Sequence, residues 1–245
     1  MSDDDHLDDG LGHSVFATLA RTLHDTATTS PDSGADAVAA DITRSATAVL
    51  PPVDHASLTL ATRWSEGLPV LRSVAATSAV ATRFDEMQRR HGDGPSMDVV
   101  RRHRTVAIDD IRTEPRRSDL LDEARDVLPI RSVLCVHLHT GADEMGALNL
   151  YADTADALRD IAGGADTLAA HAAIALSVAR HRDEFLSVLA SRDVIGQATG
   201  VLMERLSIDA GEARRLLRRR SQEDGMPLRE VAARVTATAR PPRDG

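Results

Sequence analysis

Apolar and polar residues follow two different periods along this chain. Between His55 and Leu60 they alternate one by one, which is the two-residue period of a strand with two unlike faces. From about Ala157 onward, apolar residues recur every three or four positions, as on one side of a helix. We therefore predict an α+β fold, in which a sheet forms in the first part of the chain and helices alone form the last part.

Three segments have the strand period, namely His55–Leu60, Ser132–His139 and Met145–Tyr151. The short Gly-Ala-Asp-Glu segment 141–144 is suited to a turn, so the last two strands should pair antiparallel. One face of the predicted sheet is aliphatic and suited to helices. The other face is mixed, and we predict that it lines a small-molecule pocket with Ser57, Thr59, Cys135, His137, Asn149 and Tyr151.

Further elements fit between and before these strands. Strands are predicted at Val70–Ala75 and Val106–Ile108, and helices at His13–Thr26, Asp36–Val49, Ala79–Arg90 and Met97–His103. Residues 1–12 are acidic with few apolar partners, so they should form a disordered tail. They also lack the basic start and apolar stretch of a secretory signal, and no apolar run is long enough to span a bilayer. The cytoplasm is the expected location.

A row of mostly small residues follows the sheet. Its members are spaced alternately by four and three positions, as in a helical seam: Ile161, Ala165, Leu168, Ala172, Ala175 and Ala179. Such a row is suited to close pairing with a second copy of the chain in a homodimer. It is equally suited to packing against the chain's own sheet.

Three helical patterns close the chain, each with one apolar face. The first contains Ile195, Ala198, Leu202 and Leu206, the second Ala210, Ala213 and Leu217, and the third Leu228, Val231, Ala232 and Val235. Asp209 and Glu212 have the spacing of a capping box, and Gly225 is suited to a helix end. Helices this short bury their apolar faces only against each other or the preceding helix, so a compact bundle is predicted.

Charge is unevenly distributed along the chain. The 245 residues carry a net charge of -9, but residues 192–243 hold 11 Arg against 7 Asp and Glu, a net +4. The second of the three helices contains Arg214, Arg215, Arg218, Arg219 and Arg220. Phosphate groups match such a density of guanidinium groups, because the arginine fork binds phosphate oxygens. The alternative is a solvated helix face that nearby carboxylates neutralise in part.

The segment from Arg192 to Arg205, together with Glu212-Ala213, Leu217-Arg218, Ser221 and Leu228–Ala232, closely resembles the ANTAR domain. The resemblance implies binding to paired RNA hairpins in nascent transcripts, which prevents the terminator from forming. On it we base the candidate RNA-binding residues Gln197, Ala198, Thr199, Gly200, Arg205, Arg214, Arg218, Ser221 and Arg229. The family usually has lysine at the position of Thr199 and an aromatic residue at that of Arg214. Either a guanidinium replaces the ring here, or RNA specificity is altered.

The preceding region resembles the GAF domains that come before ANTAR in many actinobacterial proteins. The segments that carry this resemblance are Gly92–Asp98, Ile108–Asp110, Pro129–Leu134 and Gly146–Tyr151. GAF domains generally bind small molecules or pair with one another. The expected organisation is therefore a tail at 1–12, a GAF-like sensor with its terminal linking helix at 13–184, and an ANTAR domain at 185–240.

Enzymatic and metal chemistry find little support in the sequence. Cys135, His137 and His139 alternate on one strand face, but a metal site needs ligands that converge from other elements as well. Asp109 and Asp110 are adjacent and should point apart. With a single cysteine, the chain forms no internal disulfide. We expect no catalytic residue, no metal and no resident cofactor, although the sensor is suited to an unidentified small-molecule ligand.

The expected protein is a signal-responsive, homodimeric RNA-binding regulator of transcription antitermination. Two other classes remain open. The arginine helix could instead dock a protein partner, in which case binding would depend little on salt. An enzyme that acts on cyclic nucleotides would show turnover.

Overall fold

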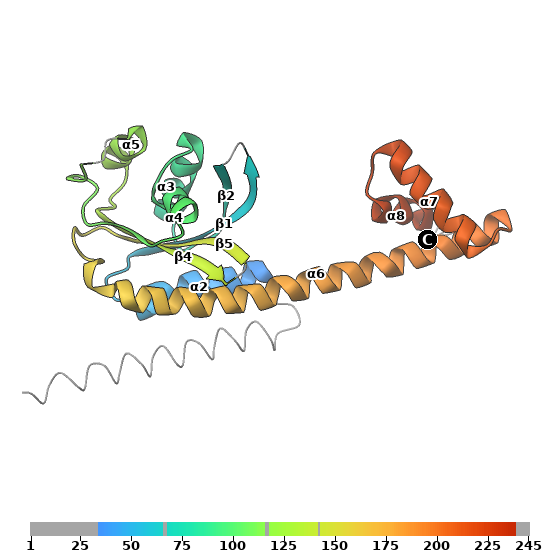
Figure 1. Ribbon diagram of the computed structural model, residues 1–245, viewed down its shortest axis with the longest axis horizontal. Helices are drawn as coiled ribbons and strands as arrows, with labels where there is room; N and C mark the ends of the chain where they lie inside the picture. Colours follow the sequence, from blue (N-terminus) through green and yellow to red (C-terminus); the bar gives the residue numbers. More distant parts are fainter. Residues whose placement is uncertain (1–33, 66–67, 116–117, 142, 239–245) are drawn as a thin grey trace, which may run out of the picture. The chain divides into compact units, whose positions relative to one another are not determined.

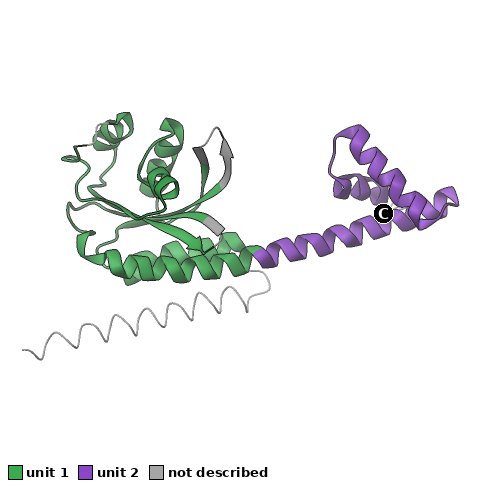
Figure 2. Cartoon of the chain, in the orientation of Figure 1, with its two compact units in different colours: residues 1–180 green, residues 181–245 purple. Residues whose placement is uncertain are grey.

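The computed structural model describes residues 34–65, 68–115, 118–141 and 143–238. The chain divides into two compact units, residues 1–180 and residues 181–245 (Figure 2). This boundary lies four residues before the one expected from sequence. The expected tail at 1–12 and the expected helix His13–Thr26 lie outside the described residues.

A five-stranded antiparallel sheet forms the centre of the first unit (Figure 1). Its order is β2-β1-β5-β4-β3, with β1 at His55–Ser65, β2 at Leu68–Ala76, β3 at Val106–Ile108, β4 at Ser132–Thr140 and β5 at Asp143–Ala152. The predicted hairpin is confirmed, because β4 and β5 pair from Ser132 opposite Ala152 to Thr140 opposite Asp143. The α+β class is confirmed as well.

Helices cover both faces of this sheet (Figure 1). Helix α2 (Ala35–Val49) and the first part of α6 (Ala162–Leu206) pack on the aliphatic face, while α3 (Ala79–His91), α4 (Pro95–Arg102) and α5 (Asp119–Val127) lie on the other. Helix α5 was not predicted from the sequence. It begins at Ser118, whose hydroxyl accepts a hydrogen bond from the Leu121 amide, and it buries only Leu120, Leu121 and Ala124.

The row of small residues on α6 packs against the chain's own sheet. Ala165, Leu168, Ala172 and Ala179 are completely buried in one core with the leucines of β4 and β5. Small side chains allow the helix to lie close to the sheet, so burial is efficient. Of the two roles that the sequence left open for this row, the structure shows the intramolecular one.

Helix α6 corrects one expectation. The stretch Arg159–Leu206 is long and apolar enough, by length and composition, to cross a membrane. The sequence interpretation required an unbroken apolar run and therefore missed it. A helix that covers a protein core passes the same test, and α6 buries a full row of its residues against the sheet.

The second unit contains three helical segments, as predicted. They are the end of α6, α7 (Ala210–Asp224) and α8 (Leu228–Ala237). The first is not a separate helix, because α6 runs unbroken to Leu206 and ends at Ser207, which has a positive φ of 53°. The predicted cap is confirmed: Asp209 Oδ1 accepts a hydrogen bond of 2.8 Å from the Glu212 amide. Gly225 ends α7 in the left-handed region, also as predicted.

Gly146 allows the close approach of two strands at the centre of the sheet. It pairs with Leu60 of β1 and Leu138 of β4, with a φ of 152°. A Cβ atom at this position would lie 1.9 Å from the carbonyl oxygen of Thr59. No side chain fits there without displacing backbone.

We expect Gly146→Ala to lower the free energy of unfolding of the first unit by roughly 2–5 kcal/mol, because it combines overpacking with backbone strain. Gly163→Ala is the matched control, since a Cβ at this helical glycine meets nothing within 4 Å. The control should be neutral or stabilising by up to about 1 kcal/mol. Thermal unfolding followed by circular dichroism measures the stability of both variants. Equal stability of the two would contradict the requirement for glycine at position 146.

Candidate functional site

The second unit is held together by a small apolar core. Ala198 from α6, Leu217 from α7, and Val231 and Ala232 from α8 are buried together. The predicted apolar faces of the three helices therefore meet, but Ala210, which is only partly buried, and Leu206 lie outside this core. Leu206, which the pattern assigned to the core, is 52% exposed because α6 ends immediately after it.

Ion pairs divide the arginines of α7 into two groups. Arg215 lies 3.8 Å from Glu212, Arg219 lies 3.9 Å from Glu223, and Arg220 donates to Asp224 at 2.9 Å. Arg214 and Arg218 make no ion pair with any residue that the structure describes. The solvated-face alternative thus accounts for three of the five arginines, whereas these two have no ion-pair partner in the part of the chain that the structure describes.

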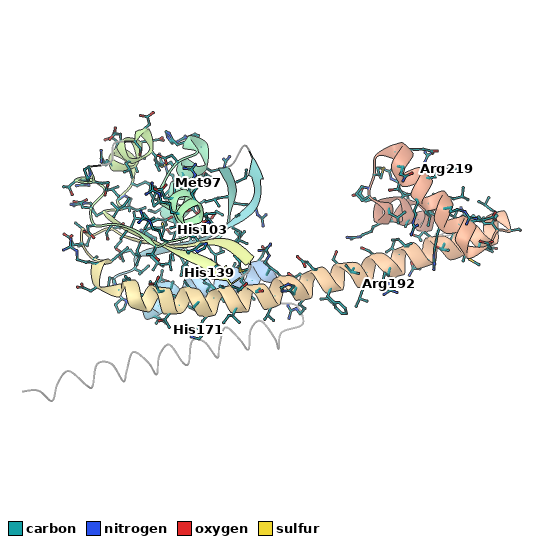
Figure 3. All side chains as sticks on the ribbon, in the orientation of Figure 1. Met97, His103, His139, His171, Arg192 and Arg219 are labelled. Carbon is teal, nitrogen blue, oxygen red and sulfur yellow. The ribbon has the colours of Figure 1, made fainter. Side chains whose placement is uncertain are left out.

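The two unpaired arginines lie on the same groove. Arg214 and Arg218 line it from α7, and Arg192, which also lacks an ion pair among the described residues, lines it from α6. Its apolar floor consists of Ile195, Leu217 and Leu228, one residue from each helix. The groove has a volume of about 300 Å³. Figure 3 labels Arg192 on α6 and Arg219, one of the paired arginines, on α7.

The other predicted RNA-binding residues are spread over the bundle. Ala198 and Thr199 are buried, and the Thr199 hydroxyl donates to the Ile195 carbonyl at 2.7 Å, so both side chains serve packing. Ser221 donates to the Met226 carbonyl at 2.6 Å and thereby fixes the turn between α7 and α8. Arg205 donates to the Thr238 carbonyl at 2.9 Å.

Like Arg205, three further predicted residues are exposed and do not line the groove, namely Gln197, Gly200 and Arg229. Gln197 follows Gly196, which does line it, and successive residues point about 100° apart around a helix. The structure thus brings only Arg214 and Arg218 of the predicted set to the groove. It adds Arg192, which sequence reasoning counted as part of the basic charge but did not select.

A buried polar network occupies the mixed face of the sheet in the first unit. Asp85 of α3 lies at its centre and accepts hydrogen bonds from Ser57 at 2.9 Å, Ser73 at 2.6 Å and Tyr151 at 2.9 Å. Next to it, Asn149 donates to Ser57 and Thr59 and accepts from Ser96 at 2.8 Å. Five of the six predicted pocket residues are therefore buried on one face, Cys135 among them.

The space beside this network is small. A cavity of about 40 Å³ is lined by Thr59, Ser73, Asp85, Gln88 and Ser96, with apolar and charged neighbours at its edge. Ligand pockets usually measure several hundred Å³, so this cavity takes water-sized occupants in the present conformation. The buried Gln88 Nε2 atom has no hydrogen-bond partner among the described residues.

Sequence reasoning missed Asp85 and Gln88, although a signal was present. Ala81, Phe84, Asp85 and Gln88 have the spacing of one helix face, and all four are buried. Burial raises the pKa of Asp85 from 3.8 to about 6, although its hydrogen bonds to Ser73, Tyr151 and Ser57 lower it. Burial also raises the pKa of the Cys135 thiol far above its usual value, so this thiol stays protonated.

The remaining predicted pocket residue, His137, packs with other histidines. Its ring centroid lies 4.9 Å from that of His139 and 5.4 Å from that of His103. In the described part of the chain, no three His, Cys, Asp or Glu side chains are placed to hold a metal ion.

Asp109 and Asp110 point to different partners. Arg131 binds both carboxylate oxygens of Asp110, and Arg159 binds Asp109 at 2.7 Å. The hydrogen bond from Arg131 lowers the pKa of Asp110 to about 2. These two carboxylates therefore act as anchors for arginines and do not form an acid–base pair.

Asp85 should make the stability of the first unit depend on pH. Its pKa in the folded state is raised, so its contribution is complete below pH 4 and is lost as the pH rises through about 6. We expect the folded chain to lose about 2.5 kcal/mol of stability relative to Asp85→Asn between pH 4 and pH 7. Urea unfolding of both proteins at several pH values measures this difference. A constant difference over that interval would contradict the raised pKa.

Comparisons with known proteins find one matching family model and several solved structures of similar fold. Residues 185–235 match the family model of the ANTAR domain. None of the curated proteins matches the chain.

Several solved structures have a similar fold over 68–74% of this chain. Free methionine-R-sulfoxide reductase from Neisseria meningitidis, solved with its substrate, has a TM-score of 0.50 and 14% identity, covering 74% of this chain and 96% of its own. The A. aeolicus nlh2 GAF domain has a TM-score of 0.49 and 10% identity, covering 68% and 98%. The GAF domain of a phosphoenolpyruvate-protein phosphotransferase from Coxiella burnetii has a TM-score of 0.48 and 16% identity. The match covers 70% of this chain and 98% of that domain.

The likeness to the reductase is a likeness of fold alone. The family match coincides with the arginine-lined bundle, since residues 185–235 include the end of α6, all of α7 and most of α8. The chain thus joins an α+β unit, whose fold resembles that of the Neisseria reductase, to a helical segment that matches the ANTAR domain.

Proposed function

We propose that this protein is a signal-responsive RNA-binding regulator, which prevents transcription termination by binding paired hairpins in nascent RNA. The observation that carries the proposal is the groove of the second unit, where Arg192, Arg214 and Arg218 converge with no ion-pair partner among the described residues. Unpaired guanidinium groups in one place attract an anion of several charges. Folded RNA supplies such an anion, and the match of this segment to the ANTAR domain supports RNA as the partner.

The first unit is the proposed sensor. Its buried network of Asp85, Asn149 and Tyr151 offers hydrogen-bonding groups beside a small cavity, and Gln88 Nε2 provides a further donor without a partner among the described residues. A signal molecule would have to enlarge this cavity to enter it. Enlargement would couple ligand binding to a shift of the helices that cover the network. The proposed sensor is not an enzyme.

The proposed protein is a homodimer. Its dimer contact does not use the row of small residues on α6, which packs against the chain's own sheet. Exposed apolar side chains follow α6 at spacings of four, seven and three positions: Ile174, Val178, Phe185 and Val188. Phe185 is 63% exposed and Val188 57% exposed. This spacing matches a heptad seam, so a second copy of the same helix is the proposed occupant. Two copies would present two bundles, which suits a paired-hairpin target.

The RNA proposal is tested by filter binding of the full chain to tandem stem-loop RNA at increasing salt. Binding should weaken steeply with salt, because phosphate contacts release counterions. Arg218→Glu should reduce the affinity at low salt by about 10-fold or more and the salt slope by about 1.

Arg220→Glu is the matched control for Arg218→Glu. It makes the same charge change on the same helix, but Arg220 is paired with Asp224 and does not line the groove. The control should lose less than about threefold in affinity, through long-range electrostatics alone. Absence of RNA binding, or an affinity that salt does not change, would favour a protein partner for the arginine helix. Equal losses in the two variants would exclude the groove as the site.

The dimer proposal is tested by light scattering of Phe185→Glu. A charge in an apolar seam is desolvated without a partner, so the variant should have the mass of one chain where the unchanged protein has that of two. Leu186→Glu is the control, because Leu186 is 48% exposed and lies about 100° further around the helix. A single-chain mass for the unchanged protein, or for both variants, would contradict the seam.

A further inference from the structure

The groove of the second unit has a size and a lining that suit one unpaired base. Its volume of about 300 Å³ is at the lower end for a small-molecule site. The apolar floor of Ile195, Leu217 and Leu228 provides a surface for the face of a planar ring. The three arginines around it provide planar cations, which stack on aromatic faces, as well as the charge for the adjoining phosphate.

The hydrogen-bonding groups of the groove are all donors. Each guanidinium carries five N–H groups and no acceptor. The other lining residues are leucine, isoleucine and glycine, so no side chain that lines the groove accepts a hydrogen bond. The backbone of this part of α6 and α7 is helical, and its carbonyls are used within the helices. A base edge that points an amino group into the groove would leave that group without an acceptor.

From this lining we infer that the groove selects an unpaired keto base, with guanine preferred, from the loop of the bound RNA. Guanine presents the acceptors O6 and N7 side by side, and an arginine fork binds both together. Uracil presents single carbonyl acceptors and ranks second. Adenine and cytosine have an exocyclic amino group on this same edge, where it would meet only donors, whereas the amino group of guanine lies on its other edge and can remain in solvent. This inference rests on the proposed RNA-binding function and adds to it the identity of the base that is bound.

Gly196 keeps the groove open on the α6 side. It lines the groove, and a Cβ atom at this position would meet nothing within 4 Å. A larger side chain can therefore be placed there without disturbing the packing of the helix. It would occupy space that the base needs and leave all three arginines in place.

The test uses the full chain and tandem stem-loops with identical stems and adenosine loops, in which one position after another is replaced. At one loop position, guanosine should bind tightest, followed by uridine, with adenosine and cytidine about 10-fold or more weaker than guanosine. Replacing that guanosine by 7-deazaguanosine, which removes only the N7 acceptor, should cost about fivefold.

Gly196→Leu distinguishes recognition of the base from binding of the phosphates. This variant should reduce the preference for guanosine over adenosine to below about twofold while its salt slope stays within about 1 of the unchanged protein. Ala190→Leu is the control, since Ala190 is exposed on the same helix and does not line the groove. It should keep the preference. Circular dichroism melting of both variants verifies that the bundle is folded.

The outcomes distinguish this inference from the function on which it rests. Hairpin binding that depends on salt but is equal for all four bases, or stronger for adenosine or cytidine, overturns the keto-base inference and leaves RNA binding in place. An unchanged guanosine preference in Gly196→Leu would place the base elsewhere and also overturns it. Absence of binding to every hairpin at low salt overturns both.

Discussion

The structure depends on the burial of a single helix in two hydrophobic cores. Helix α6 contributes Ala165, Leu168 and Ala172 to the core beneath the sheet and Ala198 to the core of the bundle. Burial of apolar surface is the main stabilising contribution in both places. Because alanine is so frequent at these positions, the backbone of α6 lies close to its neighbours, and aliphatic side chains such as Leu148 and Leu217 from other elements complete each core. This explains how a chain with 2% aromatic residues forms two packed units.

The second level of organisation is electrostatic. The carboxylates of α7 lie three or four positions from particular arginines, and these spacings decide which guanidinium groups are neutralised. The arginines left over meet Arg192 across an apolar floor. The net charge of this unit therefore does not show where an anion would bind. The positions of the acidic residues along α7 determine which arginines have no ion pair among the described residues. In the first unit, burial determines the charge state instead, because it raises the pKa of Asp85 and thereby disfavours its charged form.

Much of the fold could be predicted, because periodicity is strong where one face is buried. The strands β4 and β5, their hairpin, and the cap at Asp209 followed from local patterns. Helix α5 did not, because nine residues with five charges contain too few apolar positions to set a period. Of the residues that line the groove, the predicted set contains only Arg214 and Arg218. Resemblance selected Ala198 and Thr199 by position in a motif, but a motif does not separate side chains that pack from those that face a partner. Arg192 could not be selected from the sequence, because it lies on α6 and reaches the arginines of α7 only when the bundle is folded.

The position of Cys135 has a practical consequence. It is the only cysteine of the chain, it is fully buried, and its thiol is held in the unreactive protonated form. Thiolates are the species that react with alkylating labels, so the native protein should be silent towards them while it remains folded. A cysteine introduced on any exposed helix would then be the sole reactive handle, and a fluorophore attached to it would report from one known point without removal of the natural residue.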